Sequence, residues 1–68
     1  MDDYIKYGII GAGHLGNYHA CQLQKIPLVK LIGVFDISSK HGGLLSERYQ
    51  LENFSSVISL LKACDAVS

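Results

Sequence analysis

Apolar residues recur along this chain at two different spacings, which predict an alternation of strands and helices. Residues 4–10 (YIKYGII) and residues 28–35 (LVKLIGVF) are short runs rich in β-forming residues. Continuous apolar runs of this length are typical of parallel strands that are covered on both faces. A third, shorter strand is expected at residues 52–55, and a fourth begins as the chain ends.

In the segment after the first strand, apolar residues recur every three or four positions, as in an amphipathic helix. This helix is expected over about residues 14–26. Pro27 is expected to end it, because the residue before a proline avoids helical backbone angles. The buried stripe is predicted to consist of Leu15, Tyr18 or His19, Gln22 or Leu23, and Ile26.

Serines predict the starts of two further helices. Ser38 and Ser39 are suited to cap a helix that reaches about residue 49, although Gly42 and Gly43 each weaken it by about 1 kcal/mol. A serine at position 55 or 56 is expected to cap a third helix. The apolar stripe predicted for that helix is Val57, Leu60, Leu61 and Cys64.

The order strand, helix, strand, helix, strand, helix is that of an α/β fold with a parallel sheet. Right-handed crossovers place the helices on the faces of the sheet. The fold class is therefore the N-terminal portion of a Rossmann-type doubly wound parallel sheet, truncated at the start of the fourth strand. Since 68 residues build only a small core, residues 1–68 are expected to be the first part of a larger domain. The remainder of that domain is expected beyond residue 68.

Charge and composition narrow the class of protein. Six basic residues balance six acidic ones, which argues against a nucleic-acid or membrane-surface partner. No apolar stretch approaches the roughly 20 residues that span a bilayer. Met1-Asp2-Asp3 is acidic where a secretory signal would be basic, so a cytoplasmic location is expected. Cys21 and Cys64 are expected to be reduced core residues, and no ligand spacing suggests a metal site.

The chemistry is predicted by the glycine-rich turn GAGHLG at residues 11–16. Glycines cluster in many turns, and a plain strand–helix turn is the alternative reading. This turn, however, follows a predicted strand, opens a predicted helix and lies in a βαβ unit of the expected length. Asp36 follows Gly16 by 20 positions and stands at the end of the second strand. This combination predicts a dinucleotide site, so residues 1–68 are expected to be the first part of a dinucleotide-binding Rossmann domain.

Each glycine of the turn has a physical task. Gly11 permits the tight turn out of the strand, Gly13 lets the backbone approach a pyrophosphate, and Gly16 lets the helix pack closely on the first strand. Backbone N–H groups near Gly13 to Leu15 are expected to face the phosphates, reinforced by the helix dipole. His14 is read either as a residue beside the pyrophosphate or as a solvated loop residue.

Asp36 is the second determinant of the predicted site. A carboxylate at this position accepts hydrogen bonds from the ribose hydroxyls and repels a 2′-phosphate, which favours NAD over NADP. The following segment, SSK at residues 38–40, has side chains that suit a phosphate group, so NADP is kept as an alternative cofactor. The alternative interpretation of Asp36 is that it only caps the turn after the strand. Ile37 is read as an apolar contact for the adenine or as an exposed loop residue.

The chain resembles the start of the Gfo/Idh/MocA oxidoreductases, the family of glucose–fructose oxidoreductase and inositol 2-dehydrogenase. The resemblance covers essentially the whole chain and rests on YGIIGAGHLGNYHACQL, LVKLIGVFDIS and SERYQLENFSSVISLLKACDAVS. His19 matches a histidine often found three positions after the last glycine. From the residues alone, His19 is expected to be a core or interface residue rather than a catalytic base, and His41 to face solvent. The pair Gly42-Gly43 departs from the alanine-rich helix usual in the family.

The resemblance implies a two-domain homo-oligomer whose N-terminal domain holds NAD or NADP and whose substrate domain is expected beyond residue 68. It implies hydride transfer to or from a sugar, a cyclitol or a related hydroxyl or carbonyl compound. The family's catalytic lysine belongs to a Glu-Lys-Pro motif after the fourth strand, so no catalytic residue is assigned within residues 1–68 and these residues alone are expected to be inactive. The alternatives are a non-catalytic NAD(P)-binding sensor and a flavin-binding domain.

Overall fold

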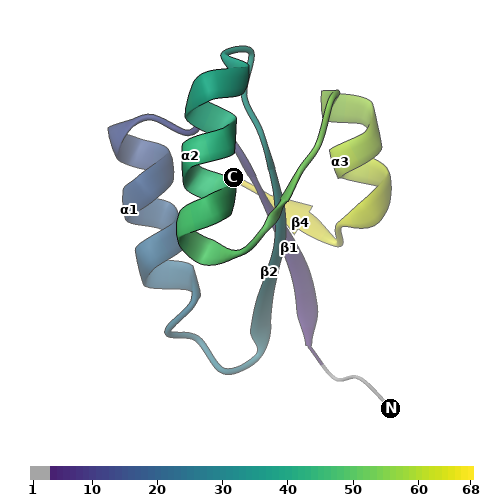
Figure 1. Cartoon of the computed structure of the whole chain (residues 1–68). Coiled ribbons are helices and arrows are strands. Elements are labelled where there is room, and N and C mark those ends of the chain that lie inside the picture. The colour runs from purple at the N-terminus through teal and green to yellow at the C-terminus, as the bar shows by residue number, and fades with distance from the viewer. Residues whose placement is uncertain (1–3) are drawn as a thin grey trace.

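Strands and helices alternate through residues 4–68, which are the residues that the computed structural model describes (Figure 1). The acidic start Met1-Asp2-Asp3 lies outside the described residues. The predicted α/β fold is confirmed. The elements, in chain order, are β1 (Ile5–Ile10), α1 (His14–Leu23), β2 (Val29–Phe35), α2 (Ser39–Tyr49), β3 (Glu52–Asn53), α3 (Val57–Ala63) and β4 (Ala66–Val67).

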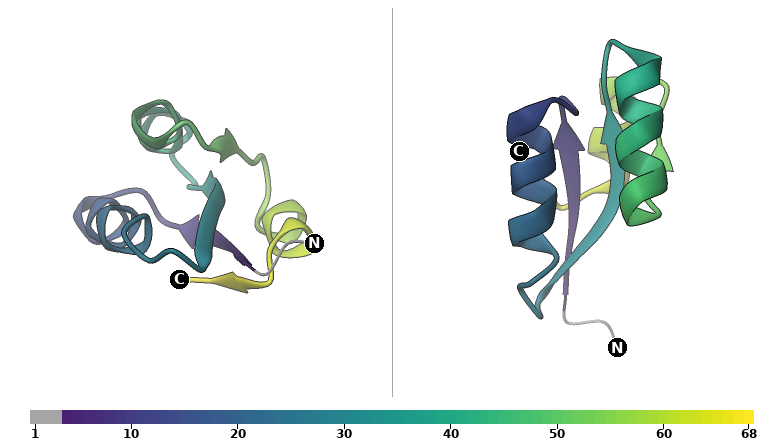
Figure 2. Two further views of the ribbon diagram at one scale, coloured as in Figure 1. Left: turned by 90° about the horizontal axis from the view of Figure 1, so that it is seen from below. Right: turned by 60° about the vertical axis from the view of Figure 1, so that its left-hand side comes forward.

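The four strands form one parallel sheet in the order β3-β2-β1-β4. Helices α1 and α2 lie on one face of this sheet and α3 lies on the other (Figures 1 and 2). The strands β2 and β3 therefore lie on one side of β1 and β4 lies on the other, so the order in which strands are added to the sheet reverses between β1 and β4. In open parallel sheets, ligands bind beyond the carboxyl ends of the strands at such a switch point.

The core lies between the sheet and the pair α1 and α2. Ile9 of β1 and Val34 of β2 are fully buried there against Ala20 of α1 and Leu45 of α2. Leu60 of α3 is fully buried on the other face of the sheet. The central strands β1 and β2 are thus covered on both faces at these positions, as their continuous apolar sequences predict.

Two predicted stripes were partly wrong. Leu15 and Tyr18 of α1 are 67% and 60% exposed and Ile26 is 45% exposed, whereas His19, the alternative to Tyr18, is half-buried and Gly16 and Ala20 are buried against the sheet. The close approach of Gly16 to β1 decides which side of α1 faces inward, and this rotation turns Leu15 and Tyr18 outward. On α3, Leu60 is buried but Leu61 is 46% exposed.

Two predicted boundaries also differ. Helix α1 ends at Leu23 and not near Ile26, because the N–H groups of Lys25 and Ile26 donate to carbonyls only three residues back. This tighter turn brings the chain to Pro27, ahead of which helical angles are disfavoured. Strand β3 ends at Asn53, two residues earlier than predicted.

Helix α2 has the predicted length despite its two glycines. Gly42 is buried, and a Cβ at this position would lie 2.9 Å from Asn53 Oδ1 and 3.5 Å from Asp36 Cβ. A larger residue would hold α2 away from the strand ends. Gly42 therefore allows close packing, although glycine has a lower helix propensity than alanine. The departure from an alanine-rich helix therefore has a packing reason.

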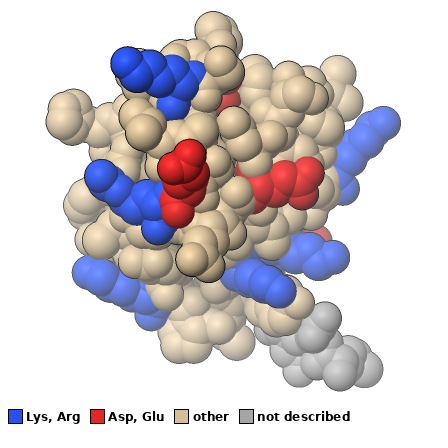
Figure 3. All heavy atoms as spheres, in the orientation of Figure 1, with Lys and Arg blue, Asp and Glu red and all other residues tan. Residues whose placement is uncertain are grey.

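The remaining surface features concern charge and thiols. Figure 3 shows acidic and basic side chains scattered over one face of the molecule. Cys21 and Cys64 are free and half-buried. Within residues 4–68, no helix is both long and apolar enough to cross a membrane, and no three His, Cys, Asp or Glu side chains gather as a candidate metal site.

Candidate cofactor-binding site

The N-terminus of α1 differs from those of the other two helices. Ser38 and Ser56 cap α2 and α3 by accepting hydrogen bonds from the N–H groups of His41 and Ser59. The residue at the same position of α1 is Gly13, which has no side chain to cap the helix; as in α2 and α3, the first turn holds no acidic residue. The N–H groups at the start of α1 therefore lack a side-chain acceptor and suit an anionic ligand.

Two glycines shape the turn that leads into α1. Gly11 has φ +91°, a left-handed conformation that residues with a Cβ rarely adopt, and its N–H donates to Phe35 O at 2.8 Å. A Cβ on Gly16 would overlap the carbonyl oxygen of Gly11. The helix therefore starts against the end of β1, which directs its open N-terminus toward the switch point.

Gly13 is different, because a Cβ there would meet nothing within 4 Å. Its backbone has φ −79° and ψ −155°, an extended conformation that any residue adopts. Neither packing nor backbone conformation in this structure requires glycine at position 13. The space in front of the residue is open, as a site for a ligand in contact with the backbone requires.

Asp36 joins the end of β2 to the glycine turn. Its Oδ2 accepts a hydrogen bond from the Ala12 N–H at 2.6 Å, and its Oδ1 accepts one from the Ser38 N–H at 2.7 Å. These two bonds, first that from Ala12, lower the pKa of Asp36 below its usual value, aided by the charge of His41 and opposed by desolvation. Asp36 is therefore ionised at neutral pH and retains lone pairs for further donors.

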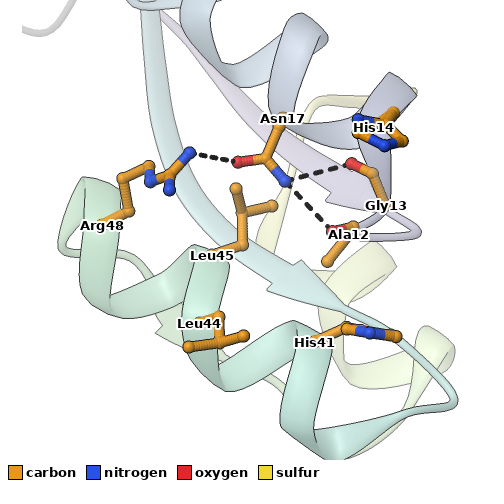
Figure 4. Close-up of a pocket in the computed structure, with 8 residues that line it drawn as sticks. All are labelled: Ala12, Gly13, His14, Asn17, His41, Leu44, Leu45 and Arg48. Atoms are coloured by element: carbon orange, nitrogen blue, oxygen red, sulfur yellow. Dashed lines mark hydrogen bonds between the residues drawn. The ribbon is translucent and has the colours of Figure 1, made fainter.

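Three recesses surround the turn. One of about 590 Å³ lies between α1 and α2 and includes Ala12, Asn17 and Arg48 in its lining (Figure 4). A second, of about 320 Å³, is lined by Gly11, the end of β2 and Val57. A third, of about 400 Å³, lies on the β4 side of the turn. Together they form an open surface around the carboxyl ends of β1 and β2.

The structure brings all the predicted cofactor residues to this surface. Gly11, Gly13, His14, Leu15 and Gly16 line the third recess, together with His19 and Ser68. Asp36 and Ile37 line the second recess with Gly11. Ile37 is 96% exposed and is therefore free to contact a ligand. His41 is exposed, as predicted, and lines the recess between α1 and α2.

Sequence reasoning missed two residues of this surface, Asn17 and Arg48. The Asn17 side chain donates to the turn carbonyls, and Arg48 of α2 donates to Asn17 (Figure 4). An asparagine directly after the last glycine is a local signal, because short polar side chains in the first turn of a helix often bond nearby backbone groups. No local signal marks Arg48, which lies 31 residues further along the chain.

The switch point, the glycine turn, the open helix N-terminus and the acid at the end of β2 together define a dinucleotide-binding Rossmann domain. Residues 5–68 match the family described as "Oxidoreductase family, NAD-binding Rossmann fold", GFO_IDH_MocA. The chain belongs to this family, the Gfo/Idh/MocA oxidoreductases, and is part of an NAD-binding Rossmann domain.

Individual relatives share the same portion. The chain is 37% identical to UDP-N-acetylglucosamine 3-dehydrogenase of Acidithiobacillus ferrooxidans, over 96% of this chain and 20% of that protein. A solved structure of that enzyme superposes with a TM-score of 0.86 at 36% identity, over 94% of this chain and 20% of the other. Glucose-6-phosphate 3-dehydrogenase of Bacillus subtilis is 32% identical, over 91% of this chain and 18% of that protein.

A further solved structure is that of myo-inositol dehydrogenase from Lactobacillus casei in complex with NAD(H) and myo-inositol. It superposes with a TM-score of 0.83 at 26% identity, over 94% of this chain and 20% of the other. The chain thus spans about a fifth of the length of the relatives that it matches.

Proposed function

We propose that residues 1–68 form the NAD-binding half-site of an oxidoreductase that transfers a hydride to or from a sugar, a cyclitol or a related hydroxyl or carbonyl compound. The observation that carries the proposal is the direct connection between the two cofactor determinants. The Asp36 carboxylate accepts from the Ala12 N–H of the glycine turn at 2.6 Å, beside the uncapped start of α1. The carboxylate that would accept from a ribose therefore lies next to the N–H groups that would donate to the adjoining pyrophosphate.

The residues around the turn fit the parts of the cofactor. The N–H groups near Gly13, His14 and Leu15 would hold the pyrophosphate, as at other helix N-termini that bind phosphate. Asp36 would accept hydrogen bonds from the adenosine ribose, and Ile37 would present an apolar surface to the adenine in the second recess. NAD supplies the hydride chemistry when bound, and these residues orient it.

The rest of the enzyme is proposed to lie beyond residue 68. The relatives are about five times as long, and their names identify dehydrogenases of a nucleotide sugar, a sugar phosphate and a cyclitol. We assign no catalytic acid or base within residues 1–68, and we expect these residues alone to be inactive. The remainder of the Rossmann domain, a substrate domain and a homo-oligomer interface belong to the proposed continuation.

The intact protein is expected to reduce NAD with a compound of this class. UDP-N-acetylglucosamine, glucose 6-phosphate and myo-inositol form the first panel, chosen from the relatives' names. Calorimetric titration measures NAD binding, and the absorbance of the reduced nicotinamide measures turnover. Binding without turnover on a broad panel of sugars and cyclitols would favour a sensor, and failure to bind NAD would refute the proposal.

Asp36→Ala is expected to weaken NAD binding far more than NADP binding. The ribose would lose charge-assisted hydrogen bonds worth about 1.5–3 kcal/mol, roughly 10- to 100-fold in Kd, while repulsion of a 2′-phosphate would disappear. Titration of both cofactors against the wild type and the variant measures this change in preference.

Because Asp36 also holds Ala12 and Ser38, a control for the turn is needed. Asp36→Asn removes the charge and keeps one acceptor, so it can retain one of these two backbone hydrogen bonds, and it should shift the preference toward NADP in the same direction. Equal losses of NAD and NADP affinity in both variants would mean that Asp36 supports the turn and does not read the ribose.

A further inference from the structure

The side chain of Asn17 holds the carbonyl groups of the glycine turn. Its Nδ2 donates to Ala12 O at 3.2 Å and to Gly13 O at 3.1 Å, while its backbone N–H donates to Gly13 O at 2.9 Å (Figure 4). The amide therefore satisfies two consecutive carbonyls of the turn that precedes α1.

These bonds also determine where the N–H groups of the turn point. A trans peptide group is planar, and its N–H points opposite to its carbonyl. The carbonyl of Ala12 shares a peptide plane with the N–H of Gly13, and that of Gly13 shares one with the N–H of His14. Since both carbonyls point toward Asn17, both N–H groups point away from it. Gly13 and His14 line both the recess between α1 and α2, which also contains Asn17, and the recess on the β4 side of the turn.

Arg48 supports the orientation of the Asn17 amide. Its Nη1, which comes from α2, donates to Asn17 Oδ1 at 3.0 Å (Figure 4). An asparagine amide has one accepting end and one donating end, whereas a guanidinium only donates. Arg48 therefore favours the rotamer in which the oxygen faces α2 and the nitrogen faces the turn. The opposite rotamer would bring Oδ1 against two carbonyl oxygens.

We propose that Asn17 and Arg48 are positioning residues for the cofactor: Asn17 fixes the peptide planes whose N–H groups receive the pyrophosphate, and Arg48 acts through Asn17 from α2. This inference rests on the proposed function, because it requires NAD at the glycine turn. Neither side chain needs to touch the cofactor. The role is distinct from that of Asp36, which holds the N–H of Ala12 from the β2 side.

Three variants of the intact protein test the inference by NAD titration, at a temperature well below the melting point of each. Asn17→Leu removes the amide with little change in size, and we expect NAD binding about 10-fold weaker. Asn17→Asp removes the donor but keeps an acceptor for Arg48, and we expect a loss at least as large. Arg48→Met removes the guanidinium, and we expect a loss of about 3-fold. Lys62→Met, on the opposite face of the sheet, removes the same charge and should bind NAD as the wild type does.

The double variant shows whether Arg48 acts through Asn17. In the Asn17→Leu background, Arg48→Met should cause no further loss, because its acceptor is already gone. An equal loss in both backgrounds would mean that Arg48 acts independently of Asn17, and it would overturn the proposed role of Arg48. Normal binding by Asn17→Leu, with weak binding by Asn17→Asp alone, would reveal only charge repulsion and would also overturn it. A wild-type protein that fails to bind NAD would instead refute the proposed function.

Discussion

Gly13→Val is expected to abolish measurable NAD binding while leaving the fold intact. A valine at the start of α1 would place its branched side chain in the open space where the pyrophosphate is proposed to meet the backbone. The backbone there is extended, with φ −79°, and a Cβ would meet no neighbour within 4 Å. Titration should show affinity reduced by at least about 100-fold, equivalent to about 2.7 kcal/mol.

The thermal melt of the same variant separates loss of the ligand site from loss of the fold. Its melting temperature without cofactor should stay close to that of the wild type. Gly43→Val is the matched control, since a Cβ there lies 3.9 Å from Asn53 Nδ2 and outside the turn, and it should bind NAD normally. Wild-type affinity in Gly13→Val would place the pyrophosphate elsewhere and remove the main support for the proposed site.

Gly16→Ala is expected to have a different and equally large effect, on stability as well as binding. The added methyl group would overlap the carbonyl oxygen of Gly11, which is backbone and has little freedom to move. Helix α1 would have to shift away from β1. Over-packing of this kind costs about 3 kcal/mol, which lowers the melting temperature of a domain by roughly 10 °C. NAD affinity should fall too, because the shift displaces the N–H groups of the turn.

Gly43→Ala provides the matched control for the glycine-to-alanine change. Its Cβ has room, and alanine favours the helix, so the variant should be as stable as the wild type or more stable by about 0.5–1 kcal/mol. Thermal or denaturant unfolding of the two variants measures both effects. If Gly16→Ala were as stable as Gly43→Ala, the close contact between α1 and the turn would not be required.

The fold was largely predictable from the chain because its signals are local. Continuous apolar runs predicted the central strands, and the serines at positions 38–39 and 55–56 predicted the starts of α2 and α3, where Ser38 and Ser56 are the caps. The glycine spacing and Asp36 likewise predicted which residues gather at the switch point. Such signals depend on backbone conformation and nearby hydrogen bonds, which a short stretch of sequence largely specifies.

Side-chain orientation was less predictable. Periodicity alone suggested that Leu15 faces the sheet together with Tyr18 or His19, but Leu15 and Tyr18 are exposed. The contact between Gly16 and the Gly11 carbonyl sets the rotation of α1, and this contact exists only once the helix has docked. The two glycines of α2 suggested a weak helix, whereas Gly42 packs against the end of β3.

The sequence by itself therefore determined the order of the elements, the parallel α/β class and the positions of Gly11, Gly13, Gly16 and Asp36 at one edge of the sheet. Only the tertiary structure decided how that edge is held together. The bonds from Ala12 to Asp36 and from Arg48 to Asn17 join residues 24 and 31 positions apart. The physical reason is distance along the chain: local patterns specify backbone conformation, whereas the partners of a polar side chain are chosen only when separate elements pack together.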